Sequence, residues 1–312
     1  MENLILSFNV VLPLFLCIML GYFLRRIGMM DEPIRLSLNK LCFKVFLPLL
    51  LFNNIYTTDI STAFNLKLIL FSVSGLAALF IVLMLFIPRI EKENPRRGVM
   101  IQAIFRGNFA LFGLPVAESL CGAANMGPTS LLVGVTVPVF NIMAVIALET
   151  FRGGKPSVRK MLRGIATNPL IIASLLGIAF NLLQVRLPSA VHESIIDLGG
   201  VATPLSLVAL GSSFMFSSVA GFRRQLVIAL AGKLVISPLI MVTLSAMMGF
   251  RAETLVPILI MFGAPTAVSS FPMAQQMGGD GDLAASLVVF TSGLAILTIF
   301  LFVFVLKTLG LI

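Results

Sequence analysis

The sequence predicts an all-α integral membrane protein of ten transmembrane helices, built as two inverted five-helix repeats in which helices 4 and 9 are broken and crossed. Three observations support this prediction: the density of apolar residues, the placement of basic residues in loops, and the recurrence of proline and glycine at one spacing. Of the 312 residues, 58% are hydrophobic and 11% are charged. Soluble domains average about 25% charged residues, so the composition indicates a membrane protein.

Ten apolar segments approach or exceed the roughly 20 residues that a helix needs to cross a bilayer. The second and seventh are the least apolar, and each contains a proline, so we expect both to be bent or partly irregular. The first is followed rather than preceded by basic residues, which favours a membrane span over a signal peptide. The ten segments are Leu4–Leu24, Leu36–Tyr56, Leu66–Pro88, Val99–Leu120, Thr129–Phe151, Ile165–Leu183, Ser194–Phe216, Leu226–Met248, Thr254–Met277 and Leu283–Leu306.

The basic residues assign an orientation to these segments. If the N-terminus lies outside, fifteen lysines and arginines fall in inner loops and four in outer ones. Cytoplasmic loops carry the excess of basic residues in membrane proteins. The sequence therefore predicts a multi-pass protein with both termini on the outer face. The same placement explains the net charge of +9 by loops beside the lipid bilayer, and we expect no nucleic-acid partner.

The two halves of the chain echo each other at a spacing of 156 or 157 residues. Each half has five predicted spans, an odd number, so the second repeat is expected to be inverted in the membrane. The predicted repeats are residues 1–151 and 152–312. The matching pairs are Pro13 and Pro169, Gly21 and Gly177, Pro48 and Pro204, Phe105 and Phe262, Pro115 and Pro272, Ala117 and Ala274, and Gly122 and Gly279.

Two of the apolar segments contain residues that interrupt a helix. Phe105–Ser119 carries Arg106, Asn108, two glycines and Pro115, and Phe262–Gln276 carries two prolines. In lipid, the backbone groups freed by such breaks need protein or a watery cavity around them. Interrupted segments at corresponding places in two halves are a sign of a transporter's binding site. We expect the outer half-helix to begin near Gly113-Leu114-Pro115. The inner one should begin near Ser269–Pro272, with Ser269 or Ser270 as its cap.

The same stretches resemble a known family. Asn108–Pro115, read Asn-Phe-Ala-Leu-Phe-Gly-Leu-Pro, is similar to the Asn-x-x-x-x-Gly-Ile/Leu-Pro stretch of the auxin efflux carrier family, and Pro265–Ala274 resembles the family's second broken segment. Ala274–Gly279 resembles the bacterial permease branch most. The chain lacks the long central loop of many plant carriers, which argues against auxin itself as the substrate.

The resemblance implies a fold related to the plant PIN auxin carriers and the bile acid sodium symporters. Helices 1, 2, 6 and 7 would form a panel or scaffold domain, and helices 3–5 and 8–10 a core or transport domain. It further implies a homodimer in the bacterial inner membrane, working as an elevator-type secondary transporter. The implied substrates are small organic anions, such as malate, malonate or auxin-like acids.

The candidate site residues form two sets. In the first set, Asn108 either contacts substrate or caps a half-helix, and Arg106 either holds an anion or extends to the inner surface. In the second, Lys233 either supplies the charge of a bound cation or extends likewise to the surface, and Glu118 either couples protons or only suits the helix dipole. Asn141, in the fifth span, is expected to lie outside the crossover. The substrate-binding set is Asn108, Gly113, Pro115, Pro265, Ser269, Ser270 and Arg106; the ion- or proton-coupling set is Glu118, Gln275, Lys233 and Gln102.

Other functional classes find less support in the sequence. Gly279–Asp282 matches the G-x-G-D string of membrane aspartyl proteases, but no partner aspartate sits within a span, and that chemistry needs two facing carboxylates. No nucleotide-binding loop or hydrolase motif occurs, so we expect no enzyme. An anion channel, or a uniporter driven by membrane potential, remains the alternative. We expect no metal and no cofactor beyond a coupled proton or Na⁺.

Overall fold

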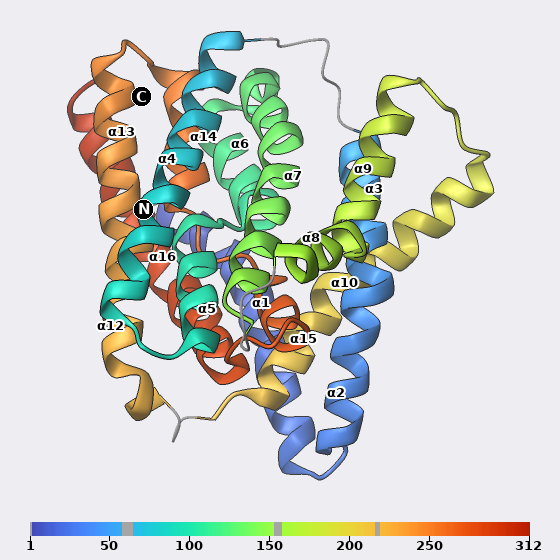
Figure 1. Cartoon of the computed structure of the whole chain (residues 1–312). Coiled ribbons are helices and arrows are strands. Elements are labelled where there is room, and N and C mark those ends of the chain that lie inside the picture. The colour runs from blue at the N-terminus through green and yellow to red at the C-terminus, as the bar shows by residue number, and fades with distance from the viewer. Residues whose placement is uncertain (1, 58–64, 153–157, 216–218) are drawn as a thin grey trace.

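The computed structural model describes residues 2–57, 65–152, 158–215 and 219–312, and the regular elements in these ranges are helices (Figure 1). Five helical stretches are long and apolar enough to cross a membrane, and shorter apolar helices accompany them. The chain is therefore a multi-pass membrane protein by length and composition. The five stretches are Leu66–Ile90, Gly127–Thr150, Ser189–Ser213, Ala220–Met247 and Gly281–Thr308.

The helices of the first half follow the predicted segments closely. Their bounds are α1 Glu2–Arg26, α2 Glu32–Leu41, α3 Leu47–Tyr56, α4 Leu66–Ile90, α5 Asn94–Phe105, α6 Leu114–Cys121 and α7 Gly127–Thr150. Short 3₁₀ or π-helical turns join some of them, at Cys42–Phe46, Phe109–Gly113 and Ala123–Asn125.

The second half begins with a short helix that precedes the predicted sixth span. The bounds are α8 Val158–Ala166, α9 Pro169–Leu182, α10 Ser189–Ser213, α12 Arg223–Ala231, α13 Ser237–Met247, α14 Ala252–Gly263, α15 Ser270–Gln276 and α16 Gly281–Thr308. A 3₁₀ turn at Ala220–Phe222 precedes α12, and a π-helical stretch at Gly232–Ile236 joins α12 to α13.

Polar side chains begin several of these helices. Asp31, Asn65, Asn168 and Asp280 each accept a hydrogen bond from a backbone N–H of the first turn. Such caps satisfy N–H groups that have no partner within the helix, and each contributes about 1 kcal/mol. The cap residues explain why α2, α4, α9 and α16 begin where they do.

Each π-helical stretch ends two residues before a proline. Cys42–Phe46 precedes Pro48, Phe109–Gly113 precedes Pro115, and Gly232–Ile236 precedes Pro238. A proline has no N–H for the carbonyl four residues back, and the wider π turn lets the chain skip that bond. The predicted irregularity near Pro48 is thus confirmed. The partial irregularity expected near Pro204 was wrong, because α10 runs as an α-helix through that residue; a bend of the helix there stays a prediction.

Close packing of glycines joins α1 to α10. A Cβ atom on Gly21 would overlap the carbonyl oxygen of Val208, and one on Gly211 would overlap that of Ile18. Small residues let helix backbones approach in membranes, where packing rather than water exclusion drives association. α10 packs against α1, α2 and α3, and α3 packs against α9, while α4, α7, α12, α15 and α16 pack against α5 (Figure 1).

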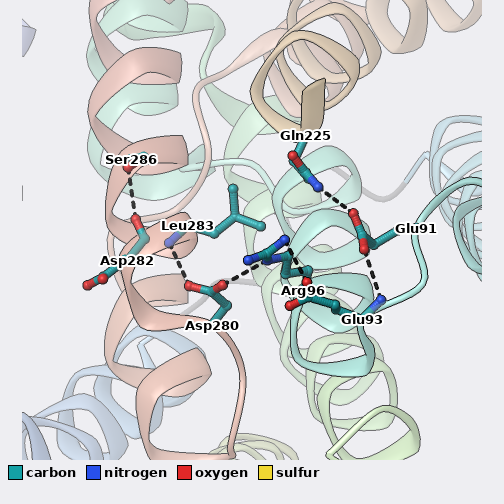
Figure 2. Close-up of polar contacts among 8 residues, drawn as sticks. All are labelled: Glu91, Glu93, Arg96, Gln225, Asp280, Asp282, Leu283 and Ser286. Atoms are coloured by element: carbon teal, nitrogen blue, oxygen red, sulfur yellow. Dashed lines mark hydrogen bonds and ion pairs between the residues drawn. The ribbon is translucent and has the colours of Figure 1, made fainter. Parts of the chain in front are cut away.

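A polar cluster closes the end of the molecule where α5 and α16 begin (Figure 2). The Arg96 guanidinium lies 3.1 Å from Asp280 and 3.0 Å from Glu93. Glu91 accepts hydrogen bonds from Gln225 at 2.6 Å and from the Glu93 N–H at 2.9 Å. Burial of the Glu91 carboxyl acts to raise its pKa, but these hydrogen bonds and the charge of Arg96 outweigh it and lower the pKa. In this cluster Asp280 has two structural roles, because it caps α16 and also pairs with Arg96.

Candidate functional site

The two interrupted segments meet where their first halves end. α5 ends at Phe105 and α14 at Gly263, and beyond these ends Gly107 and Thr266 form an antiparallel bridge. The Asn108 N–H donates to the Pro265 carbonyl at 2.7 Å. The Thr266 hydroxyl donates to the Ala103 carbonyl at 2.9 Å, so the segment after α14 is also bonded to the last turn of α5. The segments between the half-helices, residues 106–108 and 264–269, are called the two links.

The second halves begin near the predicted prolines and serines. α15 begins at Ser270, directly after Ser269, so its predicted start is confirmed. α6 begins at Leu114 with Pro115 in its first turn, but the π-helical turn Phe109–Gly113 runs directly into it, so this half-helix begins earlier than predicted. Ser269 does not cap α15 with its side chain, because its hydroxyl instead accepts a hydrogen bond from Arg106 at 2.7 Å.

A cavity of about 270 Å³ lies against this crossing. One wall is formed by the two links and the turn after them; the other walls come from α3, α7, α9 and α10. Most of the wall opposite the links is apolar. The lining residues are Leu47, Leu50, Leu51, Asn54, Arg106, Gly107, Asn108, Phe109, Ala110, Leu111, Leu114, Val137, Phe140, Asn141, Leu170, Thr203, Ser206, Ala267, Val268 and Ser269.

Arg106 brings a positive charge to this cavity. Its side chain is only 4% exposed, so it does not extend to the inner surface. The guanidinium donates to the Asn141 carbonyl oxygen Oδ1 at 2.6 Å and to Ser269, and it also contacts the Met273 sulfur. Among the described residues, no carboxylate pairs with it. Its charge is therefore solvated by neutral groups alone.

Two further polar atoms on the cavity residues lack partners in the part of the chain that the structure describes. They are Nδ2 of Asn108 and Nδ2 of Asn141, and both are buried. Buried donors in native proteins normally have an acceptor. Two such donors from different segments, beside an arginine with no carboxylate partner among the described residues, make this cavity suited to a ligand rich in acceptor atoms.

The other predicted substrate residues lie around the crossing but outside the cavity lining. Pro265 offers its carbonyl to Asn108. A Cβ on Gly113 would come within 2.7 Å of Ile260 and Phe109, so this glycine lets the turn pack on α14. The Ser270 hydroxyl is buried without a partner among the described residues. Pro115 lies in the first turn of α6.

The predicted coupling residues are not gathered at one point. Gln102 is buried beside Met273, and Lys233 is wholly buried. Gln275 lies at the end of α15, where it accepts a hydrogen bond from Asn39 of α2. Glu118 is exposed on α6. Only Gln102 and Lys233 therefore belong to the buried surroundings of the crossing.

Four polar residues that line the cavity were not predicted from the sequence: Asn54, Asn141, Thr203 and Ser206. Asn141 was expected outside the crossover and clear of the site, and this was wrong, because it lines the cavity and accepts a hydrogen bond from Arg106. The other three were not considered. The only available signal was polarity within an apolar span, which does not reveal which face of α3, α7 or α10 meets the crossing.

Comparison with known proteins identifies the family. The profile of a family described as "Membrane transport protein" matches residues 6–303. An "Uncharacterized transporter" of Methanothermobacter thermautotrophicus is 26% identical over 94% of this chain and 96% of its own. A "Putative malonate transporter" of Rhizobium meliloti is 24% identical over 93% of each chain. A "Probable auxin efflux carrier component 5a" of rice is 28% identical over 44% of this chain and 40% of its own.

These relatives are transporters rather than enzymes, and the match spans nearly the whole sequence. The family resemblance carried by Asn108–Pro115 and Pro265–Ala274 is thereby confirmed. The chain belongs to the membrane transport protein family, which is the family of the auxin efflux carriers.

Proposed function

We propose that this chain is a secondary active transporter of small organic anions, and that the carboxylate binds in the cavity at the crossing. The observation that carries the proposal is the buried Arg106 guanidinium, which has a cavity beside it and no carboxylate partner among the described residues. An unpaired charge is costly to bury. A substrate carboxylate would offset that cost and would accept the hydrogen bonds that Asn108 and Asn141 leave unused.

The relatives agree with this class of substrate. One is named for malonate and one for auxin, and both ligands carry carboxylates. The cavity presents a single arginine facing apolar side chains of α3, α7 and α9. A small carboxylate fits this lining better than a cationic or strongly polar solute.

The proposed architecture is the ten-span inverted repeat, residues 1–151 and 152–312, with both termini on the outer face of the inner membrane. α1, α2–α3, α9 and α10 would form the panel, and the remaining spans the transport domain. The cavity lies between these two groups of helices, which supports an elevator movement of one past the other. A homodimer formed through the panels would keep the panels stationary while the transport domains move.

Thermal unfolding of the purified protein with malonate, malate and indole-3-acetate tests the site. A ligand that binds only the native state raises the melting temperature by mass action. We expect at least one carboxylate to stabilise the parent and to have no effect on Arg106→Gln. The control is Arg186→Gln, which changes an exposed arginine. An equal shift in Arg106→Gln and the parent would place the anion elsewhere.

Flux into proteoliposomes separates the carrier from an anion channel. A carrier saturates with substrate and is stimulated by substrate on the opposite side of the membrane, because each cycle returns the binding site. We expect both behaviours. Flux that rises without saturation and shows no counterflow would favour the channel.

A further inference from the structure

Lys233 is the most deeply buried charged side chain that the proposed site does not use. It is 0% exposed, and its ammonium nitrogen has no hydrogen-bond partner among the described residues. It belongs to the π-helical stretch Gly232–Ile236, which packs against α5, α14 and α16. Lys233 does not line the cavity. It therefore lies behind the crossing, where substrate does not reach it.

The space next to Gly107 shows what the ammonium faces. At the point where a Cβ of residue 107 would stand, the Met261 carbonyl oxygen is 2.8 Å away and the Lys233 nitrogen is 3.3 Å away. Met261 is four residues before Pro265, which has no N–H, so its carbonyl lacks the usual helical partner. The lysine nitrogen and a freed carbonyl thus share the space that a side chain at Gly107 would fill.

Two helix C-termini meet at this place. α5 ends at Phe105, two residues before Gly107, and α14 ends at Gly263, next to Ala264, whose Cβ is 3.6 Å from the point where a Cβ of residue 107 would stand. A helix C-terminus carries roughly half a negative charge. In transporters with broken helices, such ends and the unwound carbonyls beside them commonly coordinate Na⁺ or a proton.

We propose that the Lys233 ammonium is a built-in cation that balances the carbonyl ends of α5 and α14, so that no free cation is needed at the crossing. Lys233 is then a positioning residue: it holds together the backbone that presents Arg106 and Asn108 to the cavity. The expected effect of Lys233 on transport rests on the proposed function, whereas its expected effect on the stability of the crossing does not.

The test uses thermal unfolding of Lys233→Ala without any substrate, in choline chloride and then with added n-propylammonium or Na⁺. Propylammonium approximates the atoms that the substitution removes. We expect the variant to melt at a lower temperature than the parent and to regain much of the loss with propylammonium, or with Na⁺. The parent should respond to neither. Bulky tetramethylammonium, which exceeds the vacated space, should restore nothing.

The matched control is Lys44→Ala, which removes an exposed lysine from the equivalent kind of π-helical stretch, Cys42–Phe46. It should show no cation dependence. A Lys233→Ala protein that is folded and indifferent to every cation would overturn the proposal. If that variant does not fold, the melting temperature of the parent tests the proposal. A higher melting temperature in Na⁺ than in choline would show that a free cation binds and would contradict the proposal. Equal melting temperatures would support Lys233 as the cation at the crossing.

Measurement of substrate binding is a second test of the same proposal. If a carboxylate stabilises the parent, its affinity for Lys233→Ala should fall at least 10-fold in choline and recover with propylammonium. If no carboxylate binds the parent, the proposed function fails while the substrate-free rescue still tests Lys233.

Discussion

At the scale of single residues, Asn108 combines two separable roles. Its backbone N–H is committed to Pro265, whereas its side-chain Nδ2 is buried beside the cavity with no partner among the described residues. A change of side chain can therefore alter ligand binding while the backbone bond that fastens the crossing stays in place.

We expect Asn108→Ala to weaken carboxylate binding by about 10- to 100-fold. A hydrogen bond to a charged group contributes roughly 1.5–3 kcal/mol, and about 1.4 kcal/mol corresponds to a factor of ten. Asn108→Asp should bind still more weakly, because it sets a like charge against the anion. Isothermal titration with the stabilising carboxylate measures both.

The control for this series is Asn125→Ala, because Asn125 is exposed and its side chain donates a hydrogen bond to the local Cys121 carbonyl, away from the cavity. Asn141 is unsuitable as a control, since it accepts from Arg106 within the site. Binding by Asn108→Asp that equals the parent's would mean that the carboxylate lies away from this amide.

Single residues also show which members of the site could be identified from the sequence alone. Arg106 and Asn108 were identifiable because they stand beside Pro115 in an otherwise apolar segment. Asn141 and Ser206 belong to continuous helices, α7 and α10, where nothing local distinguishes a polar residue facing a cavity from one facing a neighbouring helix. Their role depends on contacts between distant segments, which one sequence does not contain.

At the scale of elements, proline explains most of what was predicted and some of what was not. The break after α14 follows from Pro265, and Pro115 and Pro272 lie in the first turns of α6 and α15. The break after α5 lies at Gly107, eight residues before Pro115, so that proline does not cause it. Pro204 produces no break in α10, although it is the same residue type. The π-helical stretch at Lys233 was not foreseen, because a proline permits either a kink or a widened turn and packing decides between them.

The contact between α1 and α10 gives an element-level prediction. Gly211→Ala places a methyl group against the Ile18 carbonyl, and the backbones must separate to make room. We expect a loss of stability of about 1–3 kcal/mol, the usual cost of overpacking. Thermal unfolding in detergent checks it.

The same helix provides the control, since a Cβ on Gly200 would meet nothing within 4 Å. Gly200→Ala should leave stability unchanged or raise it by about 0.5–1 kcal/mol, because alanine favours the helix. Equal melting temperatures for the two variants would show that α1 and α10 are farther apart in the membrane than in this structure.

At the scale of the whole molecule, α15 joins the two groups of helices. Asn39 of α2 donates to Gln275, and Asn168 before α9 donates to the Met277 sulfur at 3.7 Å. Both contacts reach from the proposed panel to the tip of the second broken segment. If one group moves past the other during transport, these contacts must break and reform in each cycle.

Cross-linking tests that movement. In a cysteine-free background, Asn39→Cys with Gln275→Cys, joined by a short bis-methanethiosulfonate reagent, should stop transport until a reducing agent cleaves the link. The control pair is Arg96→Cys with Asp280→Cys, which replaces an ion pair between α5 and α16 (Figure 2). Both helices belong to the proposed transport domain, so that link should leave transport active. Uninterrupted transport by the linked Asn39–Gln275 pair would contradict an elevator.

The orientation of the whole chain is predicted from the distribution of basic residues, fifteen against four. Two loops that are predicted to lie on opposite faces of the membrane also lie at opposite ends of the structure. The turn between α1 and α2 lies at the bottom of Figure 1, and the connection between α13 and α14 lies at the top. The first follows Arg25 and Arg26 and is predicted to be cytoplasmic; the second is predicted to be outside.

Accessibility labelling of single cysteines tests this orientation. Met29, 63% exposed in the first turn, and Ser189, exposed where α10 begins, are suitable positions in a chain whose own cysteines have been replaced. Five predicted spans separate them, so an impermeant maleimide applied to intact cells should label Ser189→Cys and leave Met29→Cys unlabelled until the membrane is opened. Labelling of both from outside would mean an even number of spans between them. That result would remove the inverted repeat, because two five-span halves run in opposite directions only when the number of spans in each is odd.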